Sequence, residues 1–231
     1  MDFTLKHKDE MKHARFFTLL FLLACALAVP AQTFQLKVGG GLSSQSAGKK
    51  AQGAYKFGVG YEYEFNQHWA FNPSLVFYGK GWKYKDVLVN IYDDEGNQVY
   101  DEEGNPVMGL MGRSATAHYI ELPLLMNYYY RVGESRYLVA GVGPYVACGV
   151  GGKLKTNGDG AKQGPDKLFY ENPTFEVEGA RRWDVGIQAM VGYQLPVGIV
   201  VGLEADFGLT RFSAAGGRNI SGLISFTYNF K

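Results

Sequence analysis

The most constraining feature of this chain is a series of long segments in which apolar and polar residues alternate. In residues 199–209 every odd position is apolar, and the even positions include Glu204 and Asp206. Successive side chains of a β-strand point to opposite faces, so this segment has one continuous apolar face and one polar face. The same alternation recurs in residues 181–195 and 218–230. Repeated amphipathic strands of this length predict a transmembrane β-barrel.

Eight such strands are expected, separated by connections that alternate in length. They lie near residues 34–43, 54–65, 69–84, 114–131, 136–150, 181–195, 198–212 and 218–230. Short turns fall at 66–68, 133–135 and 196–197, whereas long connections fall at 85–113 and 151–180. Outer-membrane barrels have short periplasmic turns and longer outer loops. The expected fold is therefore all-β: an eight-stranded antiparallel up-and-down transmembrane β-barrel with two long extracellular loops.

The N-terminal segment has the features of a secretory signal. Residues 16–29 form an apolar run that follows Lys12 and Arg15 and is too short to span a bilayer as a helix. We expect a signal peptide over residues 1–31, with the true start at Met11, and a barrel domain over 32–231. Cys25 lies in a lipobox-like context, so lipidation is the alternative. Without that segment Cys148 is the one remaining cysteine, and no intrachain disulfide can form.

Charge and motif content exclude several functional classes. Residues 32–231 hold equal numbers of basic and acidic residues, which does not favour nucleic acid as a partner. The chain has no zinc-ligand spacing and no phosphate-binding loop, so no cofactor and no metal ligand are expected. The expected partners are outer-membrane lipid, the barrel-insertion machinery and an unidentified protein or ligand at the outer loops.

Aromatic residues near the strand ends decide between a soluble and a membrane barrel. A lipocalin-like barrel turns its apolar face inward, whereas an outer-membrane barrel turns it outward between two belts of aromatic residues. The two belts are expected to contain Trp69, Trp82, Trp183, Tyr193, Tyr228 and Phe230. Together with the secretory signal, they predict the outer membrane of a Gram-negative-type bacterium.

The polar faces of the strands place charged residues inside the barrel. The inward set is predicted to be Lys37, Lys56, Glu62, Glu64, Lys80, Glu121, Asp184, Glu204 and Asp206. Buried charges need partners, so we expect a network of ion pairs that plugs the lumen. The alternative is a narrow, cation-preferring channel for small solutes or ions.

A histidine near the outer rim is the one candidate for chemistry. His118 with Ser114 imitates the arrangement of a lipid-modifying enzyme at the outer rim. However, His118 shares its strand face with Ile120 and Leu122, so it is expected to point towards lipid. We therefore predict no catalytic residues and no enzymatic activity, and a rim enzyme stays as a minor alternative.

The first long loop contains an acidic repeat. Residues 92–99 and 100–107 match at six of eight positions, and residues 86–112 hold seven acids and no Lys or Arg. Each unit predicts a strand edge followed by a Gly-Asn turn, so the loop is expected to form a hairpin outside the membrane. A solvated acidic loop is the favoured interpretation, and binding of divalent cations or a basic partner is the alternative.

Two motifs on neighbouring strands resemble a known family. The segment Tyr119-Ile120-Glu121-Leu122-Pro123-Leu124-Leu125 resembles a signature of PorT-like outer-membrane β-barrel proteins, and Gly141-Val142-Gly143-Pro144-Tyr145 is similar to the segment that follows it there. The motif positions are Tyr119, Glu121, Pro123, Gly143 and Pro144. The resemblance implies an integral outer-membrane barrel without a common enzymatic activity or cofactor. One branch of that family is linked to assembly of a secretion apparatus.

These observations lead to one functional expectation. We expect a barrel with a plugged polar lumen that acts as a surface scaffold or interaction module through its long outer loops. An accessory role in secretion or envelope assembly follows from the family resemblance alone. One departure bears on insertion: Phe230 is followed by Lys231, whereas outer-membrane chains often end in an aromatic residue.

Overall fold

The computed structural model describes residues 32–46, 48–93, 95–158, 171–214 and 216–230. The expected signal peptide at 1–31, including Met11 and Cys25, lies outside the described residues. The regular structure that is described consists of antiparallel β-strands. In this part of the chain no helix has the length and apolar character needed to cross a membrane.

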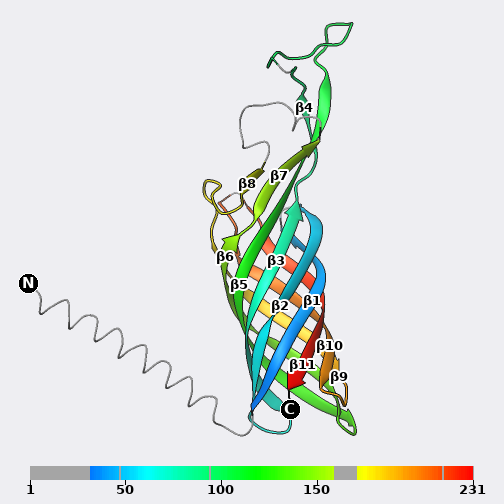
Figure 1. The fold of residues 1–231 in the computed structure, drawn as a ribbon, viewed down its shortest axis with the longest axis vertical. Coiled ribbons are helices and arrows are strands. Elements are labelled where there is room, and N and C mark those ends of the chain that lie inside the picture. The colour runs from blue at the N-terminus through cyan, green and yellow to red at the C-terminus, as the bar shows by residue number, and fades with distance from the viewer. Residues whose placement is uncertain (1–31, 47, 94, 159–170, 215, 231) are drawn as a thin grey trace, which may run out of the picture.

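Eight strands form a closed ring (Figure 1). They are β1 (Gln32–Gln45), β2 (Lys50–Glu64), β3 (Trp69–Lys83), β5 (Met108–Gly133), β6 (Arg136–Gly151), β9 (Trp183–Gln194), β10 (Ile199–Arg211) and β11 (Arg218–Phe230). Each pairs with the next barrel strand along the chain, and β1 pairs with β11 to close the barrel. The expected fold class is confirmed.

Both long outer loops contain strands beyond the eight predicted for the barrel, and in the first loop β4 and the start of β5 form a hairpin. They are β4 (Val87–Asn90), β7 (Lys153–Gly158) and β8 (Glu171–Pro173). β5 begins at Met108 rather than near residue 114, and its extra length pairs with β4 and β7, while β8 pairs with β7. These segments, with the loop between β4 and β5, extend beyond the end of the barrel opposite the end of β11 (Figure 1). We call them the outer arm. Pairing in the arm gives hydrogen-bond partners to backbone N–H and C=O groups that a single projecting strand would leave unpaired.

The apolar faces of the barrel strands point outward. On β11, Ile224 and Phe226 are 53% and 48% exposed, whereas Ser225 and Thr227 are buried. The other barrel strands repeat this arrangement, which is the reverse of a soluble barrel. Such a surface is stable only against lipid, as in a barrel that crosses a membrane.

One residue of the expected aromatic belts lies inside the barrel. Trp82 is 1% exposed, and its ring packs against Phe212 with centroids 5.0 Å apart. Trp82 shares the strand face of Lys80 and Tyr78, so its phase on β3 turns it inward. The prediction that Trp82 belongs to the lipid-facing belt is wrong. The remaining members point outward; Tyr193 is half-buried, and the exposed ones are Trp69, Trp183, Tyr228 and Phe230.

Candidate functional site

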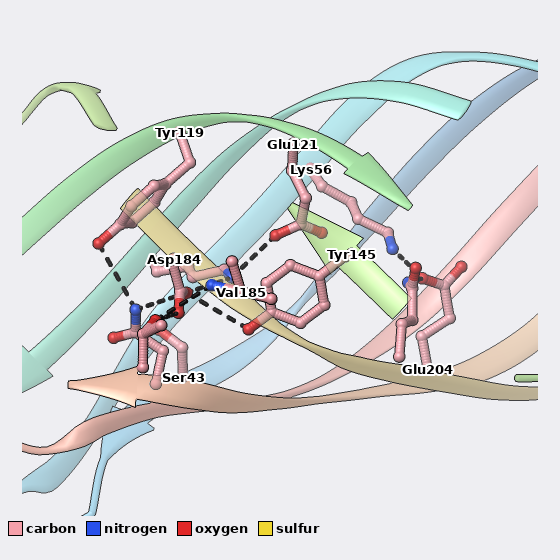
Figure 2. A network of polar contacts seen from close by, with 12 residues as sticks. Ser43, Lys56, Tyr119, Glu121, Tyr145, Asp184, Val185 and Glu204 are labelled. Atoms are coloured by element: carbon pink, nitrogen blue, oxygen red, sulfur yellow. Dashed lines mark hydrogen bonds and ion pairs between the residues drawn. The ribbon is translucent and has the colours of Figure 1, made fainter. Parts of the chain in front are cut away.

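The part of the lumen nearer the outer arm, called the upper lumen, is organised around Lys80. Its Nζ donates to Glu121 Oε2 at 2.9 Å and to Asp184 Oδ2 at 3.4 Å. Asp184 Oδ2 also accepts from the Tyr145 hydroxyl at 3.3 Å and from Asn219 Nδ2 at 2.8 Å. Figure 2 shows Glu121, Tyr145 and Asp184 converging inside the barrel. The cluster therefore joins five strands (β3, β5, β6, β9 and β11) through one ammonium group and two carboxylates.

A second ion pair lies beside this cluster. Lys56 on β2 pairs with Glu204 on β10, and the two side chains are 2% and 5% exposed (Figure 2). Gln188 Nε2 on β9 donates to the same Glu204 oxygen at 2.7 Å. Asp206, two residues further along β10, is 1% exposed. Neither of its carboxylate oxygens accepts a hydrogen bond from any residue that the structure describes.

The part of the lumen nearer the short turns, called the lower lumen, contains Lys37 and Glu62. Lys37 donates to the side-chain oxygen of Asn72, and Glu62 Oε2 accepts from the Tyr129 hydroxyl at 2.6 Å and from Asn127 at 3.1 Å. Below them a cavity of about 430 Å³ opens at the short-turn end of the barrel. Above Glu62 lies a void of about 10 Å³, lined by Lys37 and Asn72 among others, which is room for about one water molecule.

Eight of the nine charged residues assigned to the lumen lie buried there, between 0% and 7% exposed. The exception is Glu64, which is exposed and lines the cavity at the short-turn end. Its phase is inward, but it is the last residue of β2 and lies where the lumen meets water. We call the eight buried residues the lumen network; they are Lys37, Lys56, Glu62, Lys80, Glu121, Asp184, Glu204 and Asp206.

Neutral partners of this network were not predicted. Tyr145, Gln188 and Asn219 each hydrogen-bond a buried carboxylate. Their inward phase was readable from the sequence, but nothing in the alternation says which strands face one another across the ring.

The family-motif residues divide between the two faces of the wall. Tyr119, Glu121 and Pro123 are buried on the inner face of β5, and Pro144 is exposed on the outer face of β6. Gly143 lies against β5, where a Cβ would meet the Leu124 carbonyl oxygen inside contact distance. The motif therefore combines a lumen charge with a close approach of two strands.

His118, the candidate for chemistry at the outer rim, lies on the outer face of the wall among aromatic side chains. The imidazole packs on the outer face against Phe77, with ring centroids 5.5 Å apart, and lies 3.5 Å from the Tyr55 hydroxyl. In the described part of the chain no group of three or more His, Cys, Asp or Glu side chains is placed to hold a metal ion.

The tip of the outer arm is ordered by its own hydrogen bonds. Asp93 Oδ1 accepts from the backbone N–H groups of Glu95 and Asn97 at 3.0 and 2.8 Å. Asp101 repeats these contacts at the same distances with Glu103 and Asn105.

The backbone of the tip supports the same geometry. Gly96 and Gly104 occupy the left-handed region with φ of 88° and 80°, as each turn requires. Backbone hydrogen bonds also link Ile91, Val99 and Val107 in a closed ring, which fastens the two repeats together.

These contacts stabilise two exposed carboxylates in their charged form. The hydrogen bond from the Asn97 backbone lowers the pKa of Asp93 below its ordinary value, and the Asn105 backbone does the same for Asp101.

Apolar side chains are exposed on the stem of the arm. Leu88 on β4 and Leu110 on β5 are direct cross-strand partners and are 63% and 57% exposed. Met108 on the same face of β5 is also exposed. Leu110 lies eight residues beyond His118 along β5, and a strand rises about 3.3 Å per residue. These apolar side chains therefore lie beyond the end of the barrel, on the outer arm.

An eight-stranded barrel with a lipid-facing apolar wall and a buried polar interior defines an integral outer-membrane protein. Residues 21–214 match the family described as outer membrane protein beta-barrel domain, and the chain belongs to that family. It is a transmembrane protein of the Gram-negative outer membrane, exposed at the cell surface.

Solved structures similar to this chain share little sequence with it. Neisserial surface protein A is 10% identical, with 87% of this chain and 97% of that chain covered and a TM-score of 0.49. Ail, the attachment invasion locus protein of Yersinia pestis, in complex with the heparin analogue sucrose octasulfate, is 12% identical over 86% and 97%, with a TM-score of 0.39. No curated protein matches the chain.

Proposed function

We propose that this protein is a non-enzymatic surface module, in which the barrel anchors the outer arm and the arm binds a partner outside the cell. The observation that carries the proposal is the arm itself. It is built by pairing β4 and β7 with β5 and β8 with β7, and its tip is closed by a repeated set of hydrogen bonds. An ordered element loses less conformational entropy on binding than a flexible loop does.

The chemistry of the arm supports binding to a protein partner. Leu88 and Leu110 expose a paired apolar surface away from the lipid, and exposed apolar patches of this kind mark interaction sites. Tyr100 at the tip is also exposed, and tyrosines are frequent in binding hot spots. Acidic residues of the tip favour encounter with a positively charged partner.

Site-specific photo-crosslinking in intact cells tests the proposal. A crosslinker at Leu110 is expected to give a protein adduct, and the double change Leu88→Ser with Tyr100→Ser is expected to weaken it. A crosslinker at Gln67, in the short turn at the other end of the barrel, is the matched control and should not give the same adduct. Lipid adducts alone at Leu110, in cells where the protein is folded, would contradict the proposal.

We further propose that the chain is a PorT-like protein and, like one branch of that family, has an accessory role in secretion. Tyr119, Glu121, Pro123 and Gly143 carry the resemblance, and the insertion machinery and outer-membrane lipid are the partners that any such barrel needs. Deleting the gene should then reduce export of surface proteins, measured by proteomics of the surface fraction. Export at the wild-type level would restrict the proposal to surface interaction.

A narrow channel is the second candidate. It is favoured by the excess of carboxylates inside the barrel and by the cavity of about 430 Å³ that leads from the short-turn end to Glu62. The side chains packed above Glu62 oppose it.

A further inference from the structure

Asp206 is a buried carboxylate whose oxygens accept no hydrogen bond from the residues that the structure describes. It is 1% exposed, and within the described structure both Oδ1 and Oδ2 lack a hydrogen-bond donor. An unpartnered buried carboxylate is costly in a wall surrounded by lipid. The family and the proposed surface function leave this group unexplained.

The residues around Asp206 offer further oxygens. Gln188 on β9 and Ser221 on β11 are its direct cross-strand neighbours on the inner face, 1% and 4% exposed. Facing residues of this kind have Cβ atoms about 5 Å apart. Gln188 uses its amide nitrogen to bind Glu204, which leaves its Oε1 without a donor among the described residues.

Glu121 adds an acceptor from the opposite wall. Its Oε2 accepts from Lys80, while its Oε1 has no donor among the described residues. The carboxylates of Asp206 and Glu121 lie within electrostatic range of each other and of Lys56. Four acceptor-only oxygens, from Asp206, Gln188 and Glu121, thus lack hydrogen-bond donors in one part of the lumen.

The charge balance points in the same direction. Among the described residues the lumen network contains three lysines and five carboxylates. The lysines are already engaged with Asn72, Glu204, Glu121 and Asp184. Further positive charge in the lumen would therefore lower the electrostatic free energy of the folded barrel.

We propose that the barrel binds an alkali-metal cation, Na⁺ or K⁺, at Asp206, with Gln188 Oε1, Ser221 Oγ and Glu121 Oε1 as the neighbouring oxygens. Carboxylate, amide and hydroxyl oxygens are ligands for hard cations. A monovalent ion fits best because the set has only two carboxylates and two ammonium groups stand close by.

The test uses the full barrel domain refolded in zwitterionic detergent. Thermal unfolding is followed by gel mobility in NaCl, KCl or choline chloride at equal ionic strength and pH. The unfolding midpoint of the wild type should rise with Na⁺ or K⁺ concentration and saturate, since an ion that binds only the folded state stabilises it. Asp206→Asn should abolish this dependence, whereas Glu64→Gln, at the exposed mouth, should retain it.

A second variant and a direct measurement cover failure of Asp206→Asn to fold. Ser221→Ala removes one oxygen and should raise the half-saturating cation concentration by about tenfold. Relaxation of ²³Na in the presence of the barrel should be enhanced by the wild type and less by Ser221→Ala. The proposal is overturned if salt type has no effect on the wild type, or if Asp206→Asn keeps the cation dependence of the wild type. The first result would mean that a proton or water satisfies Asp206, and the second that the cation acts elsewhere.

Discussion

At the scale of single residues, charged side chains from distant parts of the sequence hold one another inside the barrel. Lys80 binds Glu121, 41 residues away, and Asp184, 104 residues away. All three are almost completely buried. Removing one partner of such a pair costs more than the pair contributes, because the remaining charge stays buried.

Replacing Glu121 by Leu should therefore destabilise the barrel. Lys80 would lose its closer carboxylate and keep the longer contact to Asp184 and its contacts with tyrosine rings. We expect a loss of about 3–5 kcal/mol in the free energy of unfolding. Urea unfolding of the refolded protein in liposomes measures the loss, with folding read from heat-modifiable gel mobility. Glu64→Gln should change stability by less than about 0.5 kcal/mol. Equal stability of Glu121→Leu and wild type would refute this role for Glu121.

The position of Trp82 has its own spectroscopic test. In single-tryptophan variants, lipids with brominated chains should quench Trp183 strongly and leave Trp82 unquenched. Trp183 is 63% exposed on the outer face and Trp82 is 1% exposed. Trp69, on the outer face at the other end, serves as a second quenched reference. Strong quenching of Trp82 would return it to the lipid-facing belt.

At the scale of elements, the spacing between β5 and β6 depends on one glycine of the family motif. A side chain at position 143 would meet the backbone of Leu124 and Leu125. Backbone atoms in a paired strand cannot move aside as the end of a flexible side chain can.

Gly143→Ala should accordingly cost about 3 kcal/mol of unfolding free energy, at the upper end for overpacked sites. Gly40→Ala is the matched control, because nothing lies within 4 Å of a Cβ built there. Unfolding midpoints and refolding yields in the same liposomes compare the two variants. A Gly143→Ala protein as stable as Gly40→Ala would mean that the strands separate without cost.

The tip of the outer arm should loosen in acid. Backbone hydrogen bonds lower the pKa values of Asp93 and Asp101 relative to the unfolded chain. Carboxylates of this kind stabilise the folded tip above their unfolded pKa, and that contribution disappears as pH falls through the lowered folded pKa. Amide protection of Asn97 and Asn105, measured by NMR, should decrease there, and Asp93→Asn should remove the dependence in the first repeat. Protection that is independent of pH would contradict this account.

At the scale of the whole molecule, the upper part of the barrel interior is filled by side chains. An eight-stranded barrel has an interior just wide enough for side chains. Tyr78, Trp82, Tyr119 and Tyr145 fill the upper part together with the lumen network. This filling is consistent with our proposal that the barrel anchors the outer arm.

Protein refolded into planar bilayers should consequently show no steady single-channel conductance. The same sample must give a heat-modifiable band, which shows that the barrel is folded. Steady unitary currents would favour the channel instead. In that case Glu62→Gln and Glu121→Gln should alter cation selectivity.

Much of this fold was predictable from local pattern, and the exceptions have identifiable causes. The eight barrel strands and the side chains on each face follow from a period of two. The position of Trp82 near a strand end suggested the aromatic belt, but its strand phase is that of Lys80, which points inward. The strands β4, β7 and β8 are short and have little alternation of their own, and they exist because β5 extends far enough to pair with them.

The sequence by itself determined which residues face lipid and which face the lumen, because each strand alternates its side chains regardless of its neighbours. Only the tertiary structure decided which inward residues meet. Closure of the ring brings β3 against β9 through Lys80 and Asp184, and β2 against β10 through Lys56 and Glu204. It also leaves Asp206 without a donor among the described residues, since the nearest ammonium groups are engaged elsewhere. Contacts across a closed barrel depend on strand order and tilt, and no local pattern encodes them.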